Sequence, residues 1–215
     1  IRNVACLGGN LVTASPISDM NPMLACMGAE LVLAKLGDDG STILRRMVPV
    51  SEFFLRYRTV DIQTSEFLEK IEVPVLSEVF EYVKPFKQAR RREDDISIVT
   101  SGMHIKLAPK DGKFIIEHVA LAFGGMAPKT VLATKTAKFM TGAEFSRETF
   151  VKASECLLEE MKLPESVPGG QAAYRMTLAT SFLYKFFLSV AGELKKDVET
   201  IVENASAFPD ISVPL

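Results

Sequence analysis

The apolar residues of this chain change their spacing once, at Gly124-Gly125-Met126. Before that point the apolar runs are short and bounded by proline or by turn sequences such as Gly-Asp-Asp-Gly and Lys-Asp-Gly, which is typical of strands. After it, apolar residues recur at intervals of three and four, which is the spacing of one helix face. Strands followed by helices predict an α+β fold, with an antiparallel sheet packed on one face by helices.

The boundaries of the expected elements follow from the same pattern. Strands are predicted over 29–36, 42–49, 66–74, 79–87, 96–107 and 114–124, the first two joined as a hairpin. Helices are predicted over 128–139, 147–161 and 171–195, with shorter helical turns at 21–27 and 51–54. Gly8-Gly9-Asn10 is expected to form a turn with φ > 0, and the final twelve residues a linker or docking tail.

Composition excludes several classes of partner. The 215 residues carry a net charge of −2, which favours a small-molecule or protein partner and argues against nucleic acid or an anionic membrane. The three cysteines are far apart and show neither a disulfide nor a metal-ligand pattern, so a reducing, cytoplasmic location is expected. No run approaches the roughly 20 apolar residues of a membrane-spanning helix.

Three segments could bind a ligand, and each also has a purely structural explanation. The glycines and hydroxyl residues of 8–15 could surround an anion or simply form a turn. The charged run 86–95 could bind a nucleotide or be a solvated surface. Phe53-Phe54 with Tyr57-Arg58 could stack on an aromatic ligand or fill a core. Taken singly, each segment favours its structural explanation.

Taken together and in order, five segments closely resemble the flavin-binding region of the xanthine dehydrogenase family. They read IRNVA-x-x-GGN-x-x-TASPISD-x-NP, FF-x-x-YR, FKQA-x-RREDDI with VTSGM, FGGMAPKT, and PGG followed by YRMTLATSFLYKF. The resemblance spans nearly the whole chain. It implies that the chain, which opens at Ile1, is a piece of a large molybdenum hydroxylase with iron–sulfur, FAD and molybdopterin domains.

The resemblance also implies a domain organisation. Residues 1–60 would be the C-terminal half of a PCMH-type FAD-binding subdomain and 61–75 a connection. Residues 76–190 would resemble the CO dehydrogenase flavoprotein C-terminal domain, and 191–215 would be a linker toward the molybdenum domain. The parent would be a cytoplasmic or peroxisomal homodimer whose 2Fe-2S and molybdopterin ligands lie outside this chain. The isolated chain is expected to be inactive.

The family's flavin contacts can be carried over residue by residue. They fall on Cys6, Leu7, Gly8, Gly9, Asn10, Asp19, Leu68 and Lys87, and Val12, Thr13 and Ser15 lie in the same loop. Lys87 would supply a positive charge that favours reduced, anionic flavin. Tyr57, Arg58 and Asp94 match the part of the family that faces a nicotinamide nucleotide. No side chain is expected to act as a catalytic acid or base.

The activity implied by the resemblance is hydride transfer. FAD reduced by iron–sulfur clusters would pass a hydride from its N5 to NAD+, while purine oxidation occurs at a molybdenum site elsewhere. Two alternatives stay open. An aldehyde oxidase-like flavin domain would reduce O2, and a non-catalytic module would only dock onto neighbouring domains. Retention of Tyr57-Arg58 and of 91–95 favours NAD+.

Overall fold

The computed structural model describes residues 3–76, 79–90 and 96–204, and within α6 it describes side chains as far as residue 200. The chain forms two compact units that interleave along the sequence. Unit 1 contains Ile1–Val75, Lys87–Gly102 and Ala122–Leu132, and unit 2 contains Leu76–Phe86, Met103–Leu121 and Ala133–Leu215. Each unit is described separately below.

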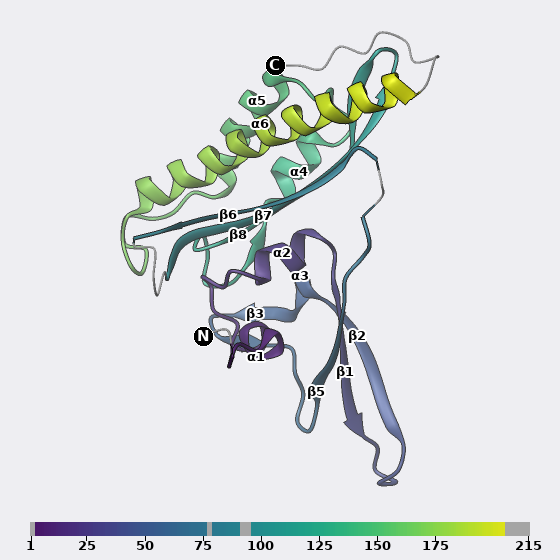
Figure 1. Ribbon diagram of the computed structural model, residues 1–215. Coiled ribbons are helices and arrows are strands. Elements are labelled where there is room, and N and C mark those ends of the chain that lie inside the picture. Colours follow the sequence, from purple (N-terminus) through teal and green to yellow (C-terminus); the bar gives the residue numbers. More distant parts are fainter. Residues whose placement is uncertain (1–2, 77–78, 91–95, 205–215) are drawn as a thin grey trace. The chain divides into compact units, whose positions relative to one another are not determined.

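Unit 1 is built on a three-stranded antiparallel sheet in the order β2-β1-β5 (Figure 1). The strands are β1 (Glu30–Leu36), β2 (Ile43–Pro49) and β5 (Phe67–Glu72). The predicted hairpin is confirmed, and Asp39 stabilises its turn by accepting hydrogen bonds from the backbone N–H groups of Ser41 and Thr42. The pairing of β1 with β5 shifts register between Val32 and Leu33.

The segments around this sheet are short. They are α1 (Leu7–Val12), α2 (Asn21–Cys26), α3 (Val50–Phe53), β3 (Phe54–Arg56) and β4 (Thr59–Val60). The predicted helical turns beginning near 21 and 51 are confirmed. Phe53 and Phe54 are 0% and 1% exposed and meet edge to face, so these two aromatic rings fill the core of unit 1.

The predicted turn at Gly8-Gly9-Asn10 is wrong, because these residues lie inside α1. Cys6 caps the helix by accepting a hydrogen bond from the Gly9 N–H at its Sγ, 3.3 Å away, and the Thr13 hydroxyl donates to the Gly9 carbonyl at 2.7 Å. The positive φ falls on Ala14, after the helix, and not on either glycine.

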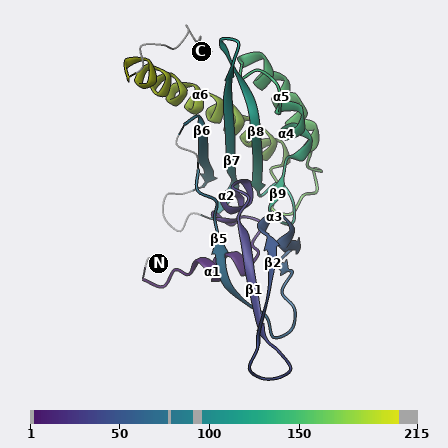
Figure 2. The same ribbon diagram turned by 90° about the vertical axis from the view of Figure 1, so that its right-hand side faces the viewer.

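A second, four-stranded sheet has the order β6-β7-β8-β9 (Figure 2). The strands of this sheet contribute residues to both units. Its strands are β6 (Glu81–Ala89), β7 (Ser97–Lys110), β8 (Lys113–Gly124) and β9 (Val131–Leu132). Asp111 and Gly112 both have positive φ in the turn between β7 and β8, as the Lys-Asp-Gly sequence predicts.

The helices that follow β9 belong to unit 2, where they cover one face of its strands and confirm the predicted α+β class (Figure 1). They are α4 (Thr134–Met140), α5 (Arg147–Glu160) and α6 (Ala172–Asn204). The first part of the predicted 128–139 helix is wrong, because Val131 and Leu132 pair with β8 instead. α6 continues past its predicted end at 195. Within the described ranges, no helix combines the length and the apolar character needed to cross a membrane.

Candidate functional site

The carboxylate of Asp19 joins the N-terminal segment of unit 1 to strand residues that lie 68 and 78 positions further along the chain. Its Oδ2 lies 2.6 Å from the Nζ of Lys87, near the end of β6, and its Oδ1 accepts a 2.7 Å hydrogen bond from Ser97 at the start of β7. Thr100 on β7 donates to the carbonyl of Ser18, next to Asp19, at 3.2 Å. The loop after α1 is therefore fixed against both strands.

Asn10 is connected to the same group through Ser18. The buried Ser18 hydroxyl donates to the Oδ1 of Asn10 at 2.7 Å and accepts from the backbone N–H of Asn21 at 3.2 Å. Because Ser18 and Asp19 are consecutive, one short loop holds the Asn10 side-chain amide and the Lys87 ammonium in place. The structure thus brings together predicted site residues from the N-terminal segment and from β6.

Leu68 of β5 meets the N-terminal segment at Gly8. A Cβ atom placed on Gly8 would stand 3.7 Å from the Cδ2 of Leu68, so the half-buried leucine lies directly against α1. The neighbouring residues Cys6, Leu7 and Gly9 are exposed to solvent. This surface therefore combines accessible backbone with an apolar side chain.

The remaining loop residues are engaged in local contacts. Thr13 is exposed and bonds to the Gly9 carbonyl, while Ser15 is half-buried and accepts a hydrogen bond from the Ile17 N–H at 3.4 Å. Val12 is half-buried. The hydroxyl of Thr13 therefore completes the end of α1 rather than standing free in a loop.

Tyr57 and Arg58 lie in the turn between β3 and β4. Both are exposed, and the Arg58 guanidinium carbon is 5.8 Å from the centre of the Tyr57 ring. Arg58 has a φ of 50°, the left-handed region, which makes the turn tight. Lys129 fixes the start of this hairpin by donating to the Phe54 carbonyl at 2.6 Å. Asp94 lies outside the described residues, as does the whole of 91–95.

Sequence reasoning missed several residues that position this site. Ser97 and Lys129 fall near or within the family-like segments, but their partners Asp19 and Phe54 lie 78 and 75 residues away in sequence. Ser18 bonds within its own segment, to Asn10 eight residues earlier. A further missed residue is Arg46, which holds the turn before β5. No local pattern reveals the pairs made by Ser97, Lys129 and Arg46, because each depends on how distant segments pack.

The donor set fits a flavin dinucleotide. Exposed glycine backbone and a fixed side-chain amide suit the polar part of such a molecule, Leu68 offers apolar surface to a ring system, and Lys87 supplies one positive charge. The donor set does not suit a metal ion. Among the residues that the structure describes, no three His, Cys, Asp or Glu side chains are grouped so that they could hold one.

The fold defines an α+β module whose donor set suits a flavin. The architecture resembles the solved Cu,Mo-CO dehydrogenase in its cyanide-inactivated form, with a TM-score of 0.69, 22% identity, and coverage of 86% of this chain and 60% of that one. Quinoline 2-oxidoreductase from Pseudomonas putida 86 gives a TM-score of 0.70 and 23% identity over 90% of this chain and 62% of that one. At such identities the likeness establishes the fold.

Sequence comparison gives the family. Residues 1–76 match the FAD binding domain in molybdopterin dehydrogenase, and residues 84–190 match the CO dehydrogenase flavoprotein C-terminal domain. The chain therefore belongs to the flavin-domain family of the molybdenum hydroxylases, and the resemblance drawn from its five segments is confirmed.

Curated relatives carry the names of oxidoreductases. Xanthine dehydrogenase of Dictyostelium discoideum is 43% identical over 90% of this chain, and xanthine dehydrogenase/oxidase of Gallus gallus is 43% identical over 92%. A nicotinate hydroxylase of Emericella nidulans is 44% identical over 87%. The chain spans only 14–15% of the length of these relatives.

Proposed function

We propose that this chain is the FAD-positioning part of a xanthine dehydrogenase-like oxidoreductase in which electrons leave through FAD to NAD+. The proposal is carried by the loop that contains Ser18 and Asp19. In this loop the Asp19 carboxylate lies 2.6 Å from the Lys87 ammonium of β6, and the Ser18 hydroxyl fixes the Asn10 side chain. This arrangement places a cation, a side-chain amide and exposed glycine backbone within one unit.

When bound, FAD supplies the hydride-transfer chemistry, and the chain binds and orients it. The proposed contacts are Cys6, Leu7, Gly8, Gly9, Asn10, Val12, Thr13, Ser15, Asp19, Leu68 and Lys87. Because the Asn10 Oδ1 already accepts from Ser18, its amide NH2 is the end that can donate to a ligand. Lys87 would stabilise negative charge on the reduced ring, and Leu68 would exclude water from one side of it.

Tyr57, Arg58 and Asp94 are proposed to face NAD+. The exposed Tyr57 ring can stack on a nicotinamide or adenine, and Arg58 can bind a phosphate with its planar, always charged guanidinium. Reduction of O2 requires no such nucleotide-binding pair. Their presence supports NAD+ as the acceptor over O2, the acceptor of an aldehyde oxidase-like domain.

The wider setting of this activity belongs to the same proposal. It comprises 2Fe-2S and molybdopterin domains in the parent protein, purine oxidation at the molybdenum site, a homodimer, and a cytoplasmic or peroxisomal location. The support is that the chain aligns with a small part of much longer relatives named xanthine dehydrogenase.

The first test uses the full protein that contains this chain, purified with flavin. Its visible flavin absorbance should persist through gel filtration, and xanthine should reduce NAD+ faster than it drives O2 uptake. Loss of all flavin would support the non-catalytic docking module, and O2 uptake that exceeds NAD+ reduction would support the oxidase alternative.

The second test concerns the nucleotide-facing pair. Arg58→Gln should lower kcat/KM for NAD+ by about 10-fold or more and leave O2 uptake unchanged, because one charge-assisted contact contributes roughly 1.5–3 kcal/mol. Arg56→Gln is the matched control, since Arg56 is also exposed and stands in the same hairpin. Equal losses in both variants, or an Arg58 variant with unchanged NAD+ kinetics, would contradict the assignment.

A further inference from the structure

We infer that Arg46 is a positioning residue for the flavin site, which it controls by holding the turn that leads into Leu68. This inference rests on the proposed function, since it assumes that Leu68 faces the flavin. Arg46 stands on β2 and was not among the residues that the sequence pattern or the family resemblance pointed to.

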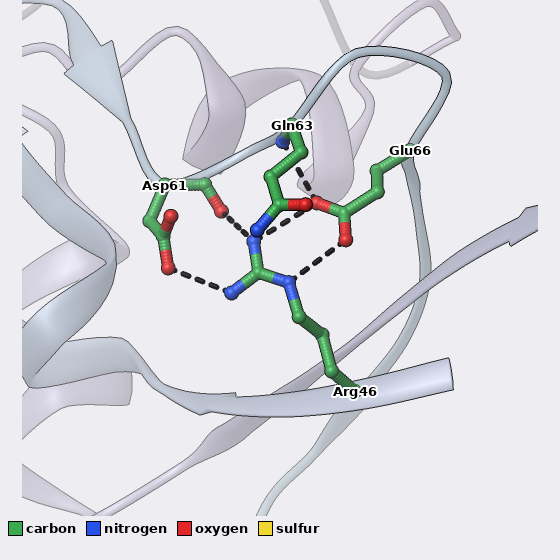
Figure 3. A network of polar contacts seen from close by, with 4 residues as sticks. All are labelled: Arg46, Asp61, Gln63 and Glu66. Carbon is green, nitrogen blue, oxygen red and sulfur yellow. Dashed lines mark hydrogen bonds and ion pairs between the residues drawn. The ribbon is translucent and has the colours of Figure 1, made fainter. Parts of the chain in front are cut away.

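The guanidinium of Arg46 binds two acidic residues of the segment before β5 (Figure 3). Its Nε and Nη2 lie 2.8 and 2.9 Å from the two carboxylate oxygens of Glu66, and its Nη1 lies 2.7 Å from the Oδ2 of Asp61. Nη2 also donates to the Asp61 carbonyl at 2.7 Å, and the N–H of Gln63 donates to Glu66 at 2.7 Å. One side chain therefore fixes both ends of the 61–66 turn.

Strand register connects this turn to Leu68. Leu33 in the middle strand β1 is paired with Arg46 on one side and with Leu68 on the other. Residues paired in this way share a face of the sheet, so Arg46, Leu33 and Leu68 form one row across the three strands. Glu66 precedes Leu68 by two residues, and the turn held by Arg46 leads directly into this row.

The pairing of β5 with β1 explains why a clamp is needed at this point. The register shifts between Val32 and Leu33, and beyond the shift only Leu33–Leu68 and Ala34–Phe67 remain paired. Such a bulge disrupts the ladder locally and bends the strand. The backbone pairing at the start of β5 is therefore limited to two residue pairs, and the Arg46 contacts hold the turn that precedes them.

Burial makes the clamp more than a surface ion pair. The Glu66 side chain is 4% exposed and that of Arg46 is 30% exposed. Hydrogen bonds from Arg46 lower the pKa of Glu66 to about 2, so this buried carboxylate stays charged. Removing the guanidinium would leave an uncompensated buried charge, and the turn would have to open to hydrate it.

The chain supplies its own control in the neighbouring Arg45. Arg45 likewise binds a glutamate with two hydrogen bonds, of 2.6 and 2.8 Å to Glu69, but this glutamate lies within β5. It projects from the opposite face of β2, and its side chain is 46% exposed. Arg45 thus tests the effect of losing an Arg–Glu pair between β2 and β5 without loss of the turn.

The experiment measures FAD affinity and the visible circular dichroism of the flavin in the full protein. Arg46→Gln should raise the FAD dissociation constant by about 10-fold and alter the dichroism, whereas Arg45→Gln should change the constant less than about 2-fold. Arg46→Lys should recover only part of the affinity, because it keeps the charge but loses the two-pronged geometry. If Arg46→Gln does not fold, Asp61→Asn loosens the same turn at a more exposed carboxylate.

A double-mutant cycle with Leu68→Ala separates positioning from general stability. If Arg46 acts through Leu68, Arg46→Gln should have little further effect on FAD affinity once Leu68 is alanine. Additive losses, or equal effects of Arg45→Gln and Arg46→Gln, would overturn the inference. A wild-type protein that binds no flavin contradicts the proposed function instead, so the two failures are distinguishable.

Discussion

At the scale of single residues, the ion pair between Asp19 and Lys87 is important for its position and not for its contribution to stability. The Asp19 side chain is 52% exposed, and an ion pair at such a surface contributes about 0–1 kcal/mol. The hydrogen bond from Ser97 nevertheless holds the Asp19 carboxylate in one place, and the carboxylate in turn holds Lys87. A cation fixed beside a flavin acts on the electronics of the ring.

Lys87→Gln should therefore change redox behaviour without changing folding. We expect the flavin midpoint potential to fall and the rate of flavin reduction to drop by about 10-fold, because the anionic reduced form loses its cation. The melting temperature should stay the same. Potentiometric titration and a thermal scan of the full protein measure the two quantities.

Lys84→Gln is the control for this prediction. Lys84 stands on the same strand β6 but pairs with Glu193 at 2.6 Å, within unit 2. Its replacement should leave the potential unchanged. If both lysine variants shift the potential equally, the effect is one of overall charge, and the role assigned to Lys87 is wrong.

The sequence predicted ligand-binding residues, and that assignment stays a prediction, but the sequence did not indicate which contacts hold those residues in place. Glycines next to an asparagine suggested a turn, yet Cys6 and Thr13 supply caps that make the segment helical, and capping by a thiol is not a common N-terminal signal. Likewise, Ser97 reaches Asp19 across 78 residues of sequence. Local patterns carry no information about contacts of that length.

At the scale of elements, prediction succeeded where turn chemistry is local. Asp39 closes the β1–β2 turn through its own neighbours, so the hairpin is visible in the sequence. β9 was missed because its two residues are a strand only through pairing with Ala122 and Phe123 of β8. The Arg46 clamp was missed for the same reason, since its partners lie 15 and 20 residues away.

The clamp predicts a pH dependence of stability. The pKa of Glu66 is lowered from an ordinary 4.5 to about 2 by its hydrogen bonds with Arg46. A carboxylate with a depressed folded-state pKa stabilises the fold above the unfolded-state pKa, and that contribution disappears as pH falls. Wild-type protein should therefore lose stability between about pH 5 and pH 2, and Glu66→Gln should lose less over the same interval.

Urea denaturation at a series of pH values measures this slope. The double variant Arg46→Gln/Glu66→Gln should show the same flattened profile as Glu66→Gln, because neither retains the titrating pair. A Glu66→Gln profile as steep as that of the wild type would show that other carboxylates dominate acid unfolding.

At the scale of the whole molecule, the two units are not consecutive stretches of sequence, so a division of the sequence into successive domains does not predict them. The strands β6, β7 and β8 each begin in one unit and end in the other, so the chain passes between the units several times. The family matches nevertheless divide the chain at about residue 80. The proposed division at 60, 75 and 190 stays a prediction.

Shared strands predict that the units unfold together. Phe187 on α6 is 2% exposed and packs against Phe145 and Phe150 in unit 2, with ring centres 5.2 and 4.6 Å apart. Phe187→Ala should destabilise the protein by about 3–5 kcal/mol through the cavity it leaves. Since β7 and β8 supply backbone to both units, flavin proposed to bind in unit 1 should be released in the same, lowered thermal transition.

Flavin fluorescence and far-ultraviolet circular dichroism, followed together during heating of the flavin-loaded protein, test this coupling. Leu188→Ala is the control, because Leu188 is the next residue of α6 but is 48% exposed, and its loss should change stability by no more than about 0.5 kcal/mol. If flavin stays bound through the Phe187→Ala transition and leaves only at the wild-type temperature, the units unfold independently. The continuous strands would then connect the units without making their folding cooperative.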